Sequence, residues 1–251
     1  MKNSLLLFII LILSSESLIS QENTLFTITY AKIFNSKLDT IKTREYKSQI
    51  NNLNILLNKY SKEVYYKLSI LNHTSMFESN KFKMENSNNK IKALAGSIGG
   101  TKGKFYINKK DSIFLNKKHF GGEDFVVKMN VKKWQILSEF KFINNFKCYK
   151  AIFLDIDSNS KRNSKKKVIA WFCPELPGFF GPSLYFGLPG LILELDNGKI
   201  ILKVKEITIK KGVKKSNFIK PFDKGMVLTE NEFKKIVRKK AEEQFGKYLK
   251  N

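Results

Sequence analysis

Apolar and polar side chains alternate over Leu25–Phe34, which predicts a first strand with Phe26, Ile28 and Tyr30 on one face. Further apolar-rich segments predict strands at 64–70, with a continuation at 76–77, and at 104–107, 112–120, 124–131, 134–142 and 146–157. Such close spacing is typical of an antiparallel meander rather than of strand–helix–strand units. We therefore expect a mainly β fold.

The segment 229–250 has the pattern of a helix. Thr229 and Glu232 match a capping box, and apolar residues from Phe233 to Leu249 recur with helical spacing. We expect this amphipathic helix to pack on the sheet or to fill its open side, with membrane association as the alternative. Residues 39–59 are ambiguous, because asparagines interrupt a helical spacing of apolar residues. Residues 78–104 are predicted to be a long surface loop.

A hairpin is predicted where an apolar run ends at Asp196-Asn197-Gly198. With Asn197 and Gly198 in the loop, Leu195 faces Ile200. Six aliphatic side chains then share one face: Leu191, Leu193, Leu195, Ile200, Leu202 and Val204. The apolar phase changes further along, which predicts a bulge near Lys205-Glu206.

The segment before this hairpin is predicted to be an irregular crossover. Pro174, Pro177 and Pro182 lie within nine positions, and proline is excluded from interior strands. Gly187 and Gly190 then allow backbone courses that side chains would obstruct, and Pro189 restricts the residue before it.

Residues 1–20 resemble a secretory signal, with Lys2 before an apolar core that is too short to span a bilayer. We expect cleavage near Gln21, with Ser17 as a rival site, and one exported domain over residues 21–251. No cysteine lies near the cleavage point, so a lipid anchor through an N-terminal cysteine is not expected. The protein would then be periplasmic or extracellular, with no transmembrane span in the mature chain.

Two cysteines belong to the predicted hairpin over residues 146–173. If this hairpin turns near Ser160-Lys161, Cys148 lies opposite Cys173 and Ala151 lies opposite Ala170. In an exported chain this register favours a Cys148–Cys173 disulfide, with two unpaired thiols as the alternative.

The net charge of +24 comes from 46 basic and 22 acidic residues, and only three of the basic residues are arginines. Arginine is the favoured residue for bidentate phosphate recognition, so its scarcity argues against nucleic-acid binding. A solvated cationic surface is the simplest interpretation. Attraction to anionic membranes or polysaccharides is the alternative.

The residues Gly187 to Ile192 spell Gly-Leu-Pro-Gly-Leu-Ile, and the chain resembles the GLPGLI family of small secreted proteins, found chiefly in Bacteroidetes. Matching landmarks, in the family's order, are Trp134, Cys148 to Ala151, Ala170 to Phe172, Pro174, Glu175, Leu176, Pro177, Gly181, Pro182, Gly187, Leu188, Pro189, Gly190 and Glu194. One departure is Cys173, where the family usually has threonine. The resemblance implies an exported β protein, and the family has no established activity.

Catalytic and metal-binding motifs are weak. His73 and His119 have no partner at ligand spacing, so no metal and no cofactor are expected. The glycines of 96–104 lack phosphate-loop spacing. Ser97, Asp111 and His119 follow hydrolase order but lack the strand-to-helix context of a nucleophile elbow.

Glu175 and Glu194 are the two carboxylates within the family landmarks. Such a pair serves glycoside hydrolysis when it is suitably spaced. The predicted register instead places Glu194 across from Ile201, with Lys199 and Lys203 as diagonal neighbours, so a structural role is favoured.

Aromatic residues concentrate around the crossover: Trp134, Trp171, Phe179, Phe180, Tyr185 and Phe186. Ordinary core packing is the simpler interpretation, and a face that binds an apolar ligand is the functional one.

Taken together, the sequence predicts a curved antiparallel sheet, forming an open or half barrel, with a C-terminal helix. The leading hypothesis is an exported, non-enzymatic envelope protein that binds a lipid or other apolar ligand. The alternative is an accessory module of an outer-membrane complex, docking through its sheet edge or the Phe179 region. An envelope hydrolase using Glu175 and Glu194 is the weaker alternative.

Overall fold

The computed structural model describes residues 23–35, 44–80, 87–156, 165–213 and 219–248. The expected signal segment 1–20 and most of the hairpin tip near residue 160 lie outside them. The strands are β1 (Leu25–Phe34), β2 (Tyr65–Leu71), β3 (Thr74–Ser79), β4 (Lys104–Asn108), β5 (Ile113–Phe120), β6 (Glu123–Lys128), β7 (Gln135–Ile143), β8 (Phe146–Ile156), β9 (Lys165–Cys173), β10 (Leu191–Asp196), β11 (Ile200–Lys210) and β12 (Met226–Leu228). The helices are α2 (Arg44–Ser61), α3 (Ser87–Ser97) and α4 (Glu230–Tyr248).

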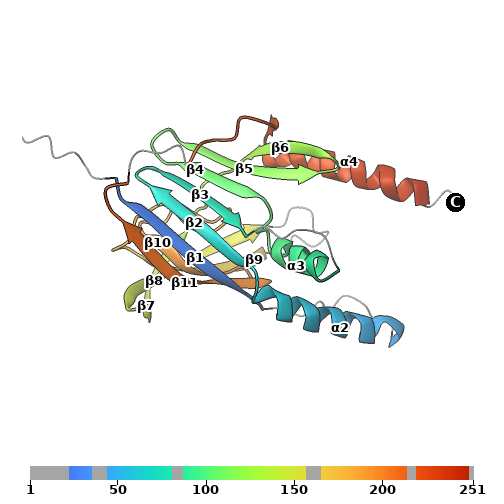
Figure 1. The fold of residues 1–251 in the computed structure, drawn as a ribbon, viewed down its shortest axis with the longest axis horizontal. Coiled ribbons are helices and arrows are strands. Elements are labelled where there is room, and N and C mark those ends of the chain that lie inside the picture. Colours follow the sequence, from blue (N-terminus) through green and yellow to red (C-terminus); the bar gives the residue numbers. More distant parts are fainter. Residues whose placement is uncertain (1–22, 36–43, 81–86, 157–164, 214–218, 249–251) are drawn as a thin grey trace, which may run out of the picture.

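The described strands form one twelve-stranded sheet in the order β12-β6-β5-β4-β3-β2-β1-β11-β10-β9-β8-β7. The paired strands are antiparallel, except that β12 runs parallel to β6. The sheet is open and curved, and α2 and α3 lie at one end of it (Figure 1). This confirms the predicted mainly β class, the open sheet and the C-terminal helix.

The predicted first strand is confirmed as β1, and its inward face starts the core. Ile28 and Tyr30 are fully buried, and Tyr30 lies opposite Tyr66 of β2. The predicted bulge is confirmed as well. Thr29 of β1 pairs with Glu206 while Tyr30 pairs with Val204, so Lys205 is the extra residue of β11. Such a bulge bends the sheet around its core.

The β10–β11 hairpin forms, but its predicted register is wrong by two residues. Leu195 pairs with Leu202 rather than with Ile200, and the loop residues are Gly198 and Lys199. The Asn197 side-chain oxygen accepts the backbone N–H groups of Lys199 and Ile200, which holds Asn197 outside the loop. A shift of two keeps every side chain on its face, so the six aliphatic residues are still buried.

The prediction of a surface loop over residues 78–104 is wrong, because α3 occupies Ser87–Ser97. Ala95 of this helix is fully buried, and Ile91 and Ile98 pack against the same core. These apolar residues repeat at intervals of four and three, so one helical stripe anchors an otherwise polar segment.

Helix α4 confirms the predicted capping box. The Thr229 N–H donates to the Glu232 carboxylate at 2.7 Å, and the Glu232 N–H donates back to the Thr229 hydroxyl at 3.3 Å. The helix packs Phe233 against Phe125 of β6, with ring centroids 5.3 Å apart, so it lies beside the β6 end of the sheet (Figure 1). No helix in the described segments is long and apolar enough to cross a membrane.

Candidate functional site

Five of the six predicted binding aromatics gather where the crossover, residues 174–190, fills the curve of the sheet. Phe180, Tyr185 and Phe186 are buried there. The Phe186 ring lies 5.7 Å from that of Phe179 and 5.0 Å from that of Phe114 in β5, between centroids. The crossover therefore packs against the other half of the sheet.

The two tryptophans lie on opposite faces. Trp134 joins the crossover, since its indole N–H donates to the Phe186 carbonyl at 2.9 Å and its ring lies 6.5 Å from that of Tyr185. Trp171 neighbours the inward-facing Phe172 on β9 and so faces outward, where the Lys141 ammonium lies 4.5 Å from its ring centre. The structure thus separates Trp171 from the other five aromatics.

The glycine-proline motif, Gly187 to Ile192, acts as scaffolding in this core. The Phe179 N–H donates to the Leu188 carbonyl at 2.7 Å, and the Gly187 N–H donates to the Phe179 carbonyl at 2.9 Å. Gly187 has a φ of +100°, and Gly190 lies directly against the backbone of Cys173 and Pro174. These contacts fold the crossover back on itself and position β10.

The two landmark glutamates have different surroundings. The Glu194 carboxylate lies 2.6 Å from the Lys141 ammonium and 3.9 Å from that of Lys203, which is its cross-strand neighbour. Glu175 is exposed in the crossover. The ion pairs account for Glu194 without catalysis. Among the described residues, no group of histidine, cysteine or carboxylate side chains is arranged to hold a metal ion.

Cys148 and Cys173 are free and buried, so the predicted disulfide is not present. The predicted hairpin register is nevertheless correct, since Ala151 pairs with Ala170 and Phe153 with Val168. The Cys148 thiol instead donates a hydrogen bond to the Phe146 carbonyl, with the sulfur 3.4 Å from that oxygen. Burial, followed by the nearby Cys173, raises the pKa of Cys148 to about 12.

We expect both thiols to resist iodoacetamide in the native protein at pH 8, because the thiolate is the reactive form and both sulfurs are buried. In denaturant without reductant, both should be alkylated within minutes, as shown by two added carbamidomethyl groups in intact-mass spectra. Recovery of unalkylated protein that reacts only after reduction would contradict free thiols.

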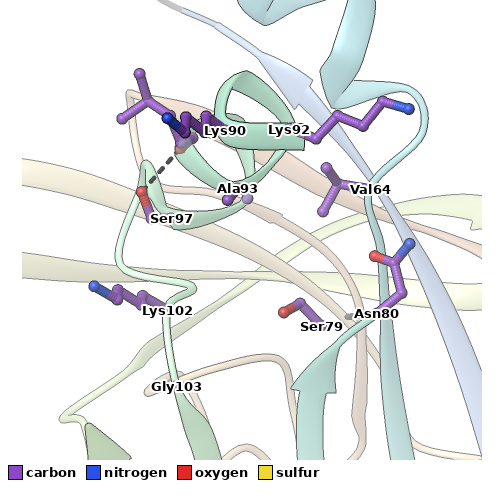
Figure 2. Close-up of a pocket in the computed structure, with 11 residues that line it drawn as sticks. Val64, Ser79, Asn80, Lys90, Lys92, Ala93, Ser97, Lys102 and Gly103 are labelled. Atoms are coloured by element: carbon purple, nitrogen blue, oxygen red, sulfur yellow. Dashed lines mark hydrogen bonds between the residues drawn. The ribbon is translucent and has the colours of Figure 1, made fainter. Parts of the chain in front are cut away.

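A recess of about 570 Å³ lies between α3 and the ends of β2 and β3. Ser79 and Asn80, at the end of β3, face Ser97 and Lys102 across it (Figure 2). We call this cavity the α3 recess, and its lining residues are Val64, Ser79, Asn80, Lys90, Lys92, Ala93, Leu94, Gly96, Ser97, Lys102 and Gly103. None of the six predicted aromatic residues is among them.

The lining of the α3 recess combines positive charge with a partly apolar wall. Lys90 and Lys102 are exposed, and neither has an ion-pair partner within the described residues. Lys92 pairs with Glu63 at 2.6 Å. Val64 is buried in the wall. Because none of the described residues that line the recess is a carboxylate, the recess is suited to an anion attached to a small apolar group.

A buried lysine lies directly behind this recess. The Lys32 ammonium donates to the carbonyls of Ala95 at 2.7 Å, Gly96 at 3.3 Å and Ile98 at 2.6 Å. It also bonds to the hydroxyls of Tyr66 and Thr101. The last carbonyls of a helix have no partner within the helix, so the buried Lys32 side chain satisfies the end of α3 by hydrogen bonding.

The environment of Lys32 perturbs its titration. The side chain is only 2% exposed, and burial lowers the pKa of Lys32 to about 7. Gly96 both lines the recess and accepts from Lys32, Tyr66 and Thr101. We call Lys32 together with Tyr66, Gly96 and Thr101 the Lys32 hub. Its hydrogen bonds set the position of one wall of the recess.

Sequence reasoning missed both the recess and the hub. Lys32 follows Phe26, Ile28 and Tyr30 at alternate positions of the strand, so the sequence places it on the same inward face. A lysine at an inward position was the signal that could have revealed the hub. The three carbonyl acceptors of Lys32 lie more than sixty residues further along the chain, in the segment predicted to be a loop.

Comparisons with known proteins give a family segment and a fold. A model of a family described as "Protein of unknown function (Porph_ging)" matches residues 155–194, which include the crossover and the glycine-proline motif. No match is found among curated proteins.

Two solved structures of a protein titled PNGF-II resemble the chain. The one in space group P21 is 16% identical with a TM-score of 0.51, covering 86% of this chain and 33% of that chain. The one in space group C2 is also 16% identical, with a TM-score of 0.48, covering 82% of this chain and 31% of that one. The likeness to the P21 structure shows a shared fold alone, and the present chain spans about a third of the PNGF-II length.

Proposed function

We propose that this chain is an exported, non-enzymatic binding protein of the GLPGLI type whose ligand is an anionic amphiphile held in the α3 recess. The observation that carries the proposal is a recess of about 570 Å³ whose described lining includes three lysines and no carboxylate. That volume lies within the range of small-molecule sites. The match of residues 155–194 to a family of unknown function supports the GLPGLI assignment, since these residues include Gly187–Ile192.

The chemistry of the lining favours an anionic head over a purely apolar ligand. Lys90 and Lys102 offer ammonium groups at the mouth, and the Ser79 hydroxyl offers a further donor. Val64 and Ala93 provide the apolar contact. Five of the six predicted aromatic residues pack instead in and around the crossover, so we propose the lipid site at α3 rather than at the crossover.

Removing the two exposed lysines should weaken binding of an anionic amphiphile. We expect Lys90→Gln/Lys102→Gln to bind decyl phosphate, below its micelle concentration, about tenfold more weakly than the unaltered chain, because two charge contacts are lost. Isothermal titration calorimetry measures this. The matched control is Lys128→Gln/Lys210→Gln, two exposed lysines outside the recess whose loss changes the net charge equally.

Two results would contradict the recess as the site. One is an equal loss of affinity in the control pair, which indicates attraction by the overall charge alone. The other is equally tight binding of 1-decanol, which has the same chain without the anion.

A further inference from the structure

The outer edge of β7 ends the sheet, and it exposes large apolar side chains. Phe140 is 54% exposed and Phe142 is 66% exposed. Strands β7 and β12 are the two edge strands, at opposite ends of the sheet. Strand β12, by comparison, contacts α4. An edge strand with exposed apolar residues is a template for pairing with another strand.

The β7–β8 turn determines which backbone groups face outward. Asn144 and Asn145 have φ values of 48° and 67°, and Ile143 pairs with Phe146, so the loop has two residues. The pair that closes such a loop is hydrogen-bonded, and the pairs alternate along the ladder. Phe140 and Phe142 therefore direct their N–H and C=O groups away from β8, towards the open edge.

The charges on β7 are arranged symmetrically about Phe140. Glu139 and Lys141 flank it and share the outer face, where Glu139 pairs with Lys150 at 2.6 Å and Lys141 pairs with Glu194 at 2.6 Å. In an antiparallel pair of identical strands centred on Phe140, each Glu139 lies opposite the Lys141 of the second copy. Opposite charges at such positions stabilise strand pairing.

We propose that two copies of this chain associate through antiparallel pairing of their β7 strands about a two-fold axis at Phe140. This register joins the outward N–H and C=O groups of Phe140 in both copies and places Phe142 opposite Ser138. The exposed phenylalanines then cover one another beside Tyr149, whose ring already lies 6.5 Å from that of Phe140. A two-fold axis makes the same edge serve both copies.

The charge of each copy does not prevent this pairing. The net charge of +24 is spread over the whole chain, whereas Glu139 and Lys141 balance each other on β7. Charges farther apart than about 8 Å are largely screened at physiological ionic strength. The pairing is thus favoured in salt and opposed at very low ionic strength.

Two charge reversals and their mixture test the register. Sedimentation velocity at physiological ionic strength should show dimers of the unaltered full chain that dissociate on dilution. Glu139→Lys alone and Lys141→Glu alone should each dimerise at least tenfold more weakly, because each places like charges opposite one another. An equimolar mixture of the two variants should recover dimers, since the lysine introduced in one variant then faces the glutamate introduced in the other.

The mixture controls for the internal ion pairs, because each variant has lost the same internal contacts whether alone or mixed. Phe142→Ser, at an exposed position, should also weaken the dimer while leaving the circular dichroism melting curve unchanged. A monomeric unaltered chain at all attainable concentrations would overturn the proposal, and so would a mixture no more dimeric than its components. Pairing only with an added acidic peptide strand would equally overturn it.

Discussion

Replacing Lys32 by methionine should lower the free energy of unfolding at pH 9 by about 3 kcal/mol. Methionine fills a similar volume but donates no hydrogen bond, so the carbonyls of Ala95 and Ile98 lose the Lys32 donor in a buried site. Gly96 keeps its bonds from Tyr66 and Thr101. Urea denaturation followed by circular dichroism measures the loss, and hydrogen exchange should show α3 opening first. A loss below about 0.5 kcal/mol would contradict a structural role for the Lys32 hub.

The same substitution should change how stability depends on pH. The pKa of Lys32 is about 7 in the folded chain against an ordinary value of 10.5. Between these values the unfolded chain binds a proton that the folded chain does not, so stability rises with pH by at most about 1.4 kcal/mol per unit. This contribution is fully present above pH 10.5 and is lost as the pH falls to 7. The difference between the two proteins should therefore be smaller at pH 6 than at pH 9.

Gly190→Ala should be the most damaging change within the glycine-proline motif, with a loss of about 3 kcal/mol or failure to fold. An added Cβ would collide with the Cys173 carbonyl oxygen, and it would lie 2.5 Å from the carbonyl carbon of Cys173 and 2.8 Å from the Pro174 nitrogen. These are backbone atoms at the junction of β9 and the crossover, so they cannot turn aside as a flexible side chain can. Thermal melting measures the effect.

Gly198→Ala in the neighbouring hairpin is the matched control. Its Cβ would meet nothing within 4 Å, although its φ of +80° disfavours alanine. We expect a loss of only about 1 kcal/mol there. Equal losses at the two positions would mean that close packing of the motif is not what requires glycine at position 190.

Much of the sheet could be predicted because each strand carries its own pattern. The alternation in β1 marked both its ends, and the phase change in β11 located the bulge at Lys205. The capping box at Thr229 is equally local, because both partners lie within four residues. These features depend on neighbours in the sequence.

The errors come from contacts that a local pattern does not contain. Helix α3 has one apolar stripe among asparagines, lysines and a glycine, and its end is satisfied by a lysine from β1. The hairpin register at Asn197 was decided by its side-chain amide, which accepts from two backbone N–H groups and donates to Gly99. The position of the α3 recess depends on the long-range hydrogen bonds from Lys32 to the end of α3.

Native mass spectrometry of the protein purified from its native source tests most directly whether the α3 recess holds the ligand. The account predicts a retained anionic adduct that is lost in Lys90→Gln/Lys102→Gln and kept in Lys128→Gln/Lys210→Gln. An adduct that persists without Lys90 and Lys102 but disappears in Trp134→Ala or Phe179→Ala would place the ligand at the crossover and contradict it.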